Sequence, residues 1–133
     1  MTKPTVLVIE DNTDIRENTV EMLHLSGYDV LTAENGSTGF VSASENHPDV
    51  ILCDILMPHT DGVGFLKLVK NERNSWNIPV IFFSAGSAPD EVLKVLNEEG
   101  YEFLSKPFTF ESLIEKVGKC LAWKHTKFHK VSA

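Results

Sequence analysis

Long apolar runs and cysteine are both scarce in this chain of 133 residues. No stretch approaches the ~20 consecutive apolar residues of a membrane-spanning helix, and residues 1–4 do not form a signal peptide. The two cysteines, Cys53 and Cys120, cannot by their spacing frame a disulfide scaffold or a metal site. These shortages favour a cytoplasmic protein that does not bind a membrane.

Basic residues are outnumbered as well. Twelve lysines and arginines accompany nineteen aspartates and glutamates, which gives a formal charge of −7. This balance disfavours direct binding of the domain to nucleic acid or to an anionic membrane. The chain is 42% apolar and 23% charged, and it contains no repeat, low-complexity tract or interior linker. These values are typical of one folded domain of ordinary size.

Short apolar runs alternate along the chain with segments of helical length. Runs rich in Val, Ile and Leu, without polar alternation, are typical of strands covered on both faces. The predicted strands are residues 5–9, 28–32, 49–53, 80–83 and 101–105. The second is the weakest and is a candidate edge strand. We therefore predict an α/β fold of flavodoxin-like type, a doubly wound five-stranded parallel sheet, (βα)5, with strand order 2-1-3-4-5.

Capping signals mark several of the five expected helices. Asn12 or Thr13 can cap the first helix, and Gly27 supplies its C-terminal stop. A third helix is expected after Gly62, and Thr109 can cap the fifth.

The end of the chain differs from the rest in composition. We expect residues 4–122 to form the domain and residues 123–133 to be a basic C-terminal tail or linker remnant. The tail loses the apolar periodicity of the helix before it. A fraying helix end or a linker is the simpler interpretation, and a peptide that docks on a partner is the alternative.

Four predicted strands run into residues that can handle a phosphoryl group. The first runs into Glu10-Asp11, the third into Asp54, the fourth into Ser84 and the fifth into Lys106. Ligands in open α/β sheets bind outside the carboxyl ends of the strands. We therefore expect one site that holds three carboxylates, a hydroxyl and an ammonium.

The crowded carboxylates need a compensating interaction. Two unit charges ~4 Å apart repel by roughly 4 kcal/mol at an effective dielectric near 20. Protonation, the Lys106 ammonium or a bound cation could offset this repulsion. Oxygen ligands in a shallow, wet cleft suit Mg²⁺, whereas the lack of His and Cys among the residues into which these strands run weighs against zinc. Helix capping would explain Asp11 but not Asp54, since no helix directly follows Asp54.

A carboxylate can also act as a nucleophile and form an aspartyl phosphate. Phosphoryl transfer mainly requires positioning and neutralisation of the charge on the equatorial oxygens. Asp54 as acceptor, with Mg²⁺ on one side and Lys106 on the other, meets that requirement. The Ser84 hydroxyl can donate a hydrogen bond to a phosphoryl oxygen.

Taken together, these motifs resemble those of the receiver domains of two-component response regulators. The matching segments are Glu10-Asp11, residues 54–58 with Asp61-Gly62, Ser84-Ala85 and residues 106–108. They occur in the family's order and spacing over about residues 4–122.

The resemblance implies a role for each residue of the site. It implies that Asp54 accepts a phosphoryl group from a phosphohistidine of a sensor histidine kinase or a phosphotransfer protein. Mg²⁺ would be bound by Asp11, Asp54 and the main-chain carbonyl of Leu56, with Glu10 contributing through water. The family's motifs also make Ser84 the switch hydroxyl, Lys106 the phosphoryl contact and Phe103 the switch aromatic.

This interpretation predicts a phosphorylation-dependent signalling switch. Repacking of the fourth helix, fifth strand and fifth helix would control a partner or an effector domain. The domain would not be an enzyme in the usual sense, although it would promote its own phosphorylation and dephosphorylation. Phosphorylation-dependent homodimers are common in the family. The kinase, the signal and the downstream partner are left open.

Three alternatives fit the sequence less well. An aspartate-nucleophile phosphatase typically has a second Asp two residues after the first, where this chain has Leu56. A flavin or dinucleotide module needs a Gly- or Ser/Thr-rich loop after the first strand, where Glu10-Asp11 would repel a phosphate. A pseudo-receiver that only binds partners is disfavoured by the complete acidic set and the lysine.

Overall fold

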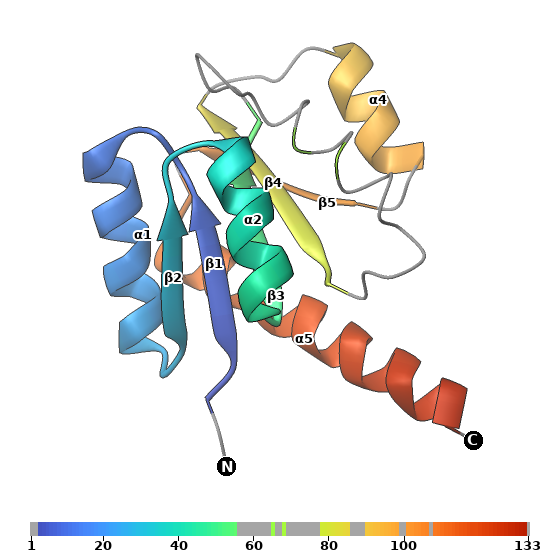
Figure 1. The fold of residues 1–133 in the computed structure, drawn as a ribbon. Coiled ribbons are helices and arrows are strands. Elements are labelled where there is room, and N and C mark those ends of the chain that lie inside the picture. Colours follow the sequence, from blue (N-terminus) through green and yellow to red (C-terminus); the bar gives the residue numbers. More distant parts are fainter. Residues whose placement is uncertain are drawn as a thin grey trace.

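The computed structural model describes residues 3–55, 65, 68, 78–85, 90–98, 101–106 and 108–132. A parallel sheet with strand order β2-β1-β3-β4-β5 forms its centre (Figure 1). The strands are β1 (Thr5–Ile9), β2 (Asp29–Ala33), β3 (Val50–Asp54), β4 (Val80–Ala85) and β5 (Glu102–Lys106). The predicted α/β class, strand order and edge position of the second strand are confirmed.

Among the described residues, three helices connect successive strands: α1 (Thr13–Leu25), α2 (Gly36–Asn46) and α4 (Asp90–Glu98). Helix α5 (Phe110–Ser132) follows the last strand. The expected third helix lies outside the described residues, apart from Phe65 and Leu68, which are helical. Within the described part of the chain, none of the helices combines the length and apolar character needed to cross a membrane.

The C-terminal segment is helical rather than irregular. Helix α5 continues without interruption through residues 123–132, so the loss of apolar periodicity there does not end the helix. No glycine or proline occurs after Gly118 to stop it. Figure 1 shows the second half of α5 extending past the sheet towards the C-terminus. A linker role for residues 123–133 stays a prediction.

Local hydrogen bonds explain why α1 begins and ends where it does. The Oδ1 atom of Asn12 accepts a hydrogen bond from the amide three residues later, at 3.0 Å. At the other end Gly27 has φ +88°, a conformation that glycine adopts without a Cβ clash. The amide of Gly27 then donates to the carbonyl of His24 at 3.0 Å, and that of Tyr28 to the carbonyl of Leu23 at 3.1 Å.

Side-chain caps also begin α2 and α5. Asn35 Oδ1 accepts from the Thr38 amide at 2.9 Å. Thr109 Oγ1 accepts from the Ser112 amide at 3.0 Å, and Ser112 Oγ accepts from the Thr109 amide at 3.0 Å. These bonds satisfy first-turn amides that lack a partner within the helix. They fix the points at which the chain leaves each strand end.

Helices cover both faces of the sheet, as predicted from the uninterrupted apolar character of the strand sequences. One buried cluster lies under α2 and α4 and includes Leu7, Ile9, Ala43, Ile51, Cys53, Phe82 and Leu96. The other lies under α1 and α5 and includes Val6, Val8, Leu23, Leu52, Phe83, Leu113 and Val117. Strand residues alternate between the two clusters because successive side chains point to opposite faces. The sheet is therefore a rigid platform for the groups at its edge.

Candidate functional site at the carboxyl edge of the sheet

The register of the strands brings their carboxyl ends to one edge. Asp54, the last residue of β3, pairs with Phe83, so Ser84 lies one step further along β4. Lys106, the last residue of β5, pairs with Ala85. The backbone positions of Ser84 and Lys106 therefore stand at the edge where β3 ends.

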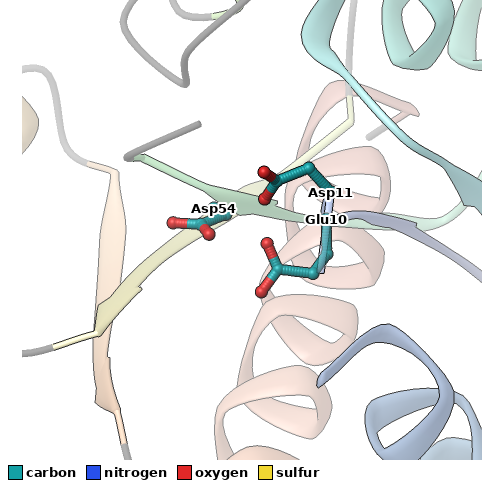
Figure 2. A group of neighbouring side chains, drawn as sticks. All are labelled: Glu10, Asp11 and Asp54. Carbon is teal, nitrogen blue, oxygen red and sulfur yellow. The ribbon is translucent and has the colours of Figure 1, made fainter. Parts of the chain in front are cut away.

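Three carboxylates converge at this edge, those of Glu10, Asp11 and Asp54. One carboxylate oxygen of each lies within 4.8 Å of those of the other two. Figure 2 shows Glu10 and Asp11, at the end of β1, gathered with Asp54 at the end of β3. Glu10 is completely buried, Asp54 is 5% exposed and Asp11 is exposed.

The electrostatics of this cluster favour a cation. Glu10 and Asp54 are both buried, so their repulsion within 4.8 Å amounts to about 3 kcal/mol at an effective dielectric of about 20. A divalent cation placed between the carboxylates would convert that repulsion into attraction. Asp11, on the exposed side, leaves the cluster open to solvent and hence to an entering ion.

The donor set fits Mg²⁺. Two oxygens bound to one octahedral Mg²⁺ at ~2.0–2.1 Å are about 3 to 4 Å apart. A group of oxygens within 4.8 Å of one another needs only small rotations, or one bridging water, to reach that geometry. All three donors are carboxylates, which suit Mg²⁺ better than zinc. In the part of the chain that the structure describes, no other group of His, Cys, Asp and Glu residues offers such a cluster.

The main chain of Glu10 is held from two sides. Its amide donates to the carbonyl of Ala33 in β2 at 3.0 Å. Its carbonyl accepts a hydrogen bond from Nη1 of Arg16 in α1 at 2.8 Å. The Nη2 atom of the same guanidinium lies 3.9 Å from Oε1 of Glu34. Arg16 is not among the site residues predicted from the sequence. The only sequence signal was a basic residue in the first turn of the helix that follows the acidic pair.

The other predicted site residues are described to different extents. Leu56 lies outside the described residues. For Ser84 and Lys106 the strand positions are described, and their roles stay predictions. Phe103 is half-buried and packs against the cluster under α2 and α4, which contains Phe82 and Leu96.

Comparison of the sequence with known proteins gives a consistent result. Residues 6–118 match the sequence profile of the response regulator receiver domain. The transcriptional regulatory protein PrrA of Mycobacterium tuberculosis is 37% identical over 117 residues, which cover 88% of this chain and 49% of PrrA. The chain thus spans about half the length of such curated relatives.

Solved structures agree with the sequence relatives. The chemotaxis protein CheY4 of Vibrio cholerae superimposes with a TM-score of 0.80 at 27% identity, covering 90% of this chain and 100% of CheY4. A response regulator receiver domain from Clostridium thermocellum gives a TM-score of 0.82 at 26% identity, covering 92% and 98% of the two chains. Both comparisons extend over nearly the whole fold described above.

Proposed function

The chain belongs to the response regulator receiver family, and from this membership we propose that Asp54 is its phosphoryl acceptor. Receiver domains are signalling domains, and accepting a phosphoryl group is their general function. The observation that carries the proposal is the convergence of Asp54 with Glu10 and Asp11 at the carboxyl edge of the sheet. The donor is a phosphohistidine of a sensor histidine kinase or of a phosphotransfer protein.

We assign Mg²⁺ to the acidic cluster. Asp11 and Asp54 provide two carboxylate ligands, and the main-chain carbonyl of Leu56 provides the third protein ligand. Glu10 binds the ion through a water molecule. When bound, Mg²⁺ supplies the positive charge that lets an anionic phosphoryl group approach an anionic acceptor. The oxygen-only donor set and the burial of Glu10 and Asp54 support this assignment.

The transfer itself is a substitution at phosphorus. An Oδ atom of Asp54 forms the new O–P bond while the N–P bond of the donor breaks, and the donor imidazole leaves with the bonding electron pair. The product is an acyl phosphate on Asp54. In the proposal the Lys106 ammonium and the Ser84 hydroxyl contact the phosphoryl oxygens. Because Asp54 is 5% exposed, such charged and polar contacts act with little screening by water.

The acyl phosphate then biases a two-state equilibrium. Phosphorylation adds roughly −1.5 to −2 charge, and Ser84 moves towards it while Phe103 turns inward. Two contacts support a response through β5. Phe103 packs with the cluster that contains Leu96 of α4, and Glu102 beside it pairs with Lys116 of α5 at 3.1 Å. Repacking of α4, β5 and α5 would control a downstream partner, an effector domain or a phosphorylation-dependent homodimer.

Mass spectrometry of the intact protein tests the acceptor. Incubation with acetyl phosphate and Mg²⁺ is expected to add one phosphoryl group to the wild-type protein and none to Asp54→Asn. Asp29→Asn is the matched control, because Asp29 is an exposed aspartate of β2 outside the acidic cluster, and it should react like the wild type. An adduct that persists in Asp54→Asn would refute the assignment.

A further inference from the structure

A half-buried arginine lies next to the acidic cluster without belonging to it. The Arg16 side chain is 15% exposed, and its Nη1 atom donates to the Glu10 carbonyl at 2.8 Å. The Nη2 atom lies 3.9 Å from Oε1 of Glu34, a carboxylate that is 78% exposed. The guanidinium therefore makes its short hydrogen bond to the main chain of the acidic pair. Its ion pair with Glu34 is longer and exposed to solvent.

Holding this carbonyl also fixes the next residue. The carbonyl of Glu10 and the amide of Asp11 belong to one planar peptide unit, so they turn together. The Glu10 amide is already bonded to Ala33 of β2 at 3.0 Å. With both main-chain groups of Glu10 engaged, the directions in which the Glu10 and Asp11 side chains leave the backbone are set.

We propose that Arg16 is a positioning residue of the metal site. Its guanidinium holds the Glu10–Asp11 peptide unit in the orientation that directs both carboxylates towards Asp54. This inference rests on the proposed function, since it takes Mg²⁺ as the ion that the cluster receives. The polar contacts of Arg16 with described residues are to the Glu10 carbonyl and the Glu34 carboxylate, neither of which is a proposed metal ligand, so we expect it to act through the Glu10–Asp11 peptide unit.

The sign of one effect separates positioning from a purely electrostatic role. Arg16 is a cation beside a site for a cation, so loss of its charge alone would strengthen Mg²⁺ binding. Loss of positioning would weaken it, because the carboxylates must then be ordered when the ion binds. A lysine ammonium could replace the short bond to the Glu10 carbonyl, but as a point charge it would not also reach Glu34 as the planar fork of arginine does.

Calorimetric titration with Mg²⁺ compares the wild type with three variants. Arg16→Ala is expected to bind Mg²⁺ about 10-fold more weakly, the equivalent of one hydrogen bond from a charged group. Arg16→Lys keeps the charge and one donor, and it should recover most of this loss. Glu34→Gln is the matched control, because it removes the exposed ion-pair partner and leaves the bond to the Glu10 carbonyl. Its dissociation constant should stay within about 2-fold of the wild-type value.

Hydrogen exchange without metal gives a second, independent measurement. The Glu10 amide, which donates to the Ala33 carbonyl, should exchange faster in Arg16→Ala than in the wild type, and amides in the middle of β3 should not change. Unchanged or tighter Mg²⁺ binding by Arg16→Ala, together with unchanged exchange at Glu10, would overturn the proposal. If Arg16→Ala does not fold, Arg16→Met takes its place, because it keeps an apolar stem of similar length without a donor and should show the same loss. A wild-type protein without affinity for Mg²⁺ would instead refute the metal site, and the exchange at Glu10 would still test Arg16.

Discussion

The centre and the edge of the sheet differ in how tightly their residues are enclosed. All residues of β3 are buried, as are four of the five in β1. By contrast Glu102 and Phe103, which begin β5 at the edge, are half-buried. A side chain packed on all sides has little room to move, whereas a half-buried one can change its rotamer at low cost. The acidic cluster thus lies at the ends of the tightly packed central strands β1 and β3. The proposed conformational response involves the edge strand β5, whose side chains have more room to rearrange.

Two phenylalanines allow this comparison to be tested directly. Phe82 of β4 and Phe103 of β5 are register partners, but Phe82 is completely buried and Phe103 is half-buried. Phe82→Ala should lower the free energy of unfolding by about 3–5 kcal/mol, because it leaves a cavity in the core. Phe103→Ala should cost less than half as much, since part of its ring already contacts water.

Urea denaturation measures both losses, with Phe82→Leu as a milder variant that keeps the protein folded. Equal losses for the two alanine variants would contradict the distinction between centre and edge.

Mg²⁺ should stabilise the centre more than the edge. At a concentration 100 times its dissociation constant, a ligand that binds only the folded state adds about 2.7 kcal/mol to the free energy of unfolding. Asp11→Asn should lose most of this gain, whereas Asp14→Asn, which changes an exposed aspartate of α1, should keep it.

Urea denaturation with and without Mg²⁺ measures the gain, and hydrogen exchange locates it. Protection should increase at the ends of β1 and β3. An equal increase along β5 would show that edge and centre respond as one unit.

The smallest expected effect concerns Cys120, where α5 packs on the sheet. Burial raises the pKa of this thiol from 9.0 to about 11, and the Glu102 carboxylate adds to the increase. The folded state therefore binds this proton more tightly than the unfolded state. The resulting stabilisation is complete below pH 9 and is lost as the pH rises towards 11. After solvent screening it should be on the order of 1 kcal/mol.

The difference in stability between the wild type and Cys120→Ala, followed from pH 8 to pH 11, isolates this contribution. A difference that does not change with pH would mean that the thiol ionises as readily in the folded protein as in the unfolded chain.

The acidic cluster could be predicted because it follows from topology. Once the apolar runs are parallel strands, the residues after them must meet at one edge, and this places Asp54 near Glu10 and Asp11. The caps at Asn12, Gly27 and Thr109 were equally predictable, because they depend on hydrogen bonds between near neighbours in the sequence.

Arg16 could not be predicted in this way. Its bond to the Glu10 carbonyl depends on how closely the first turn of α1 approaches the end of β1, and periodicity does not specify that distance. The length of α5 could not be predicted for a different reason. An apolar stripe indicates which face of a helix is buried, but its disappearance only means that burial stops. A segment without glycine or proline can remain helical beyond that point.

The length of α5 has a mechanical consequence. The ten residues beyond Ala122 add about 15 Å of helix at ~1.5 Å per residue. If α5 tilts by about 10° where it packs on the sheet, the end of this ten-residue extension moves by roughly 3 Å. Small shifts where α5 meets β5 would thus be amplified at its far end, as by a lever whose fulcrum is the sheet.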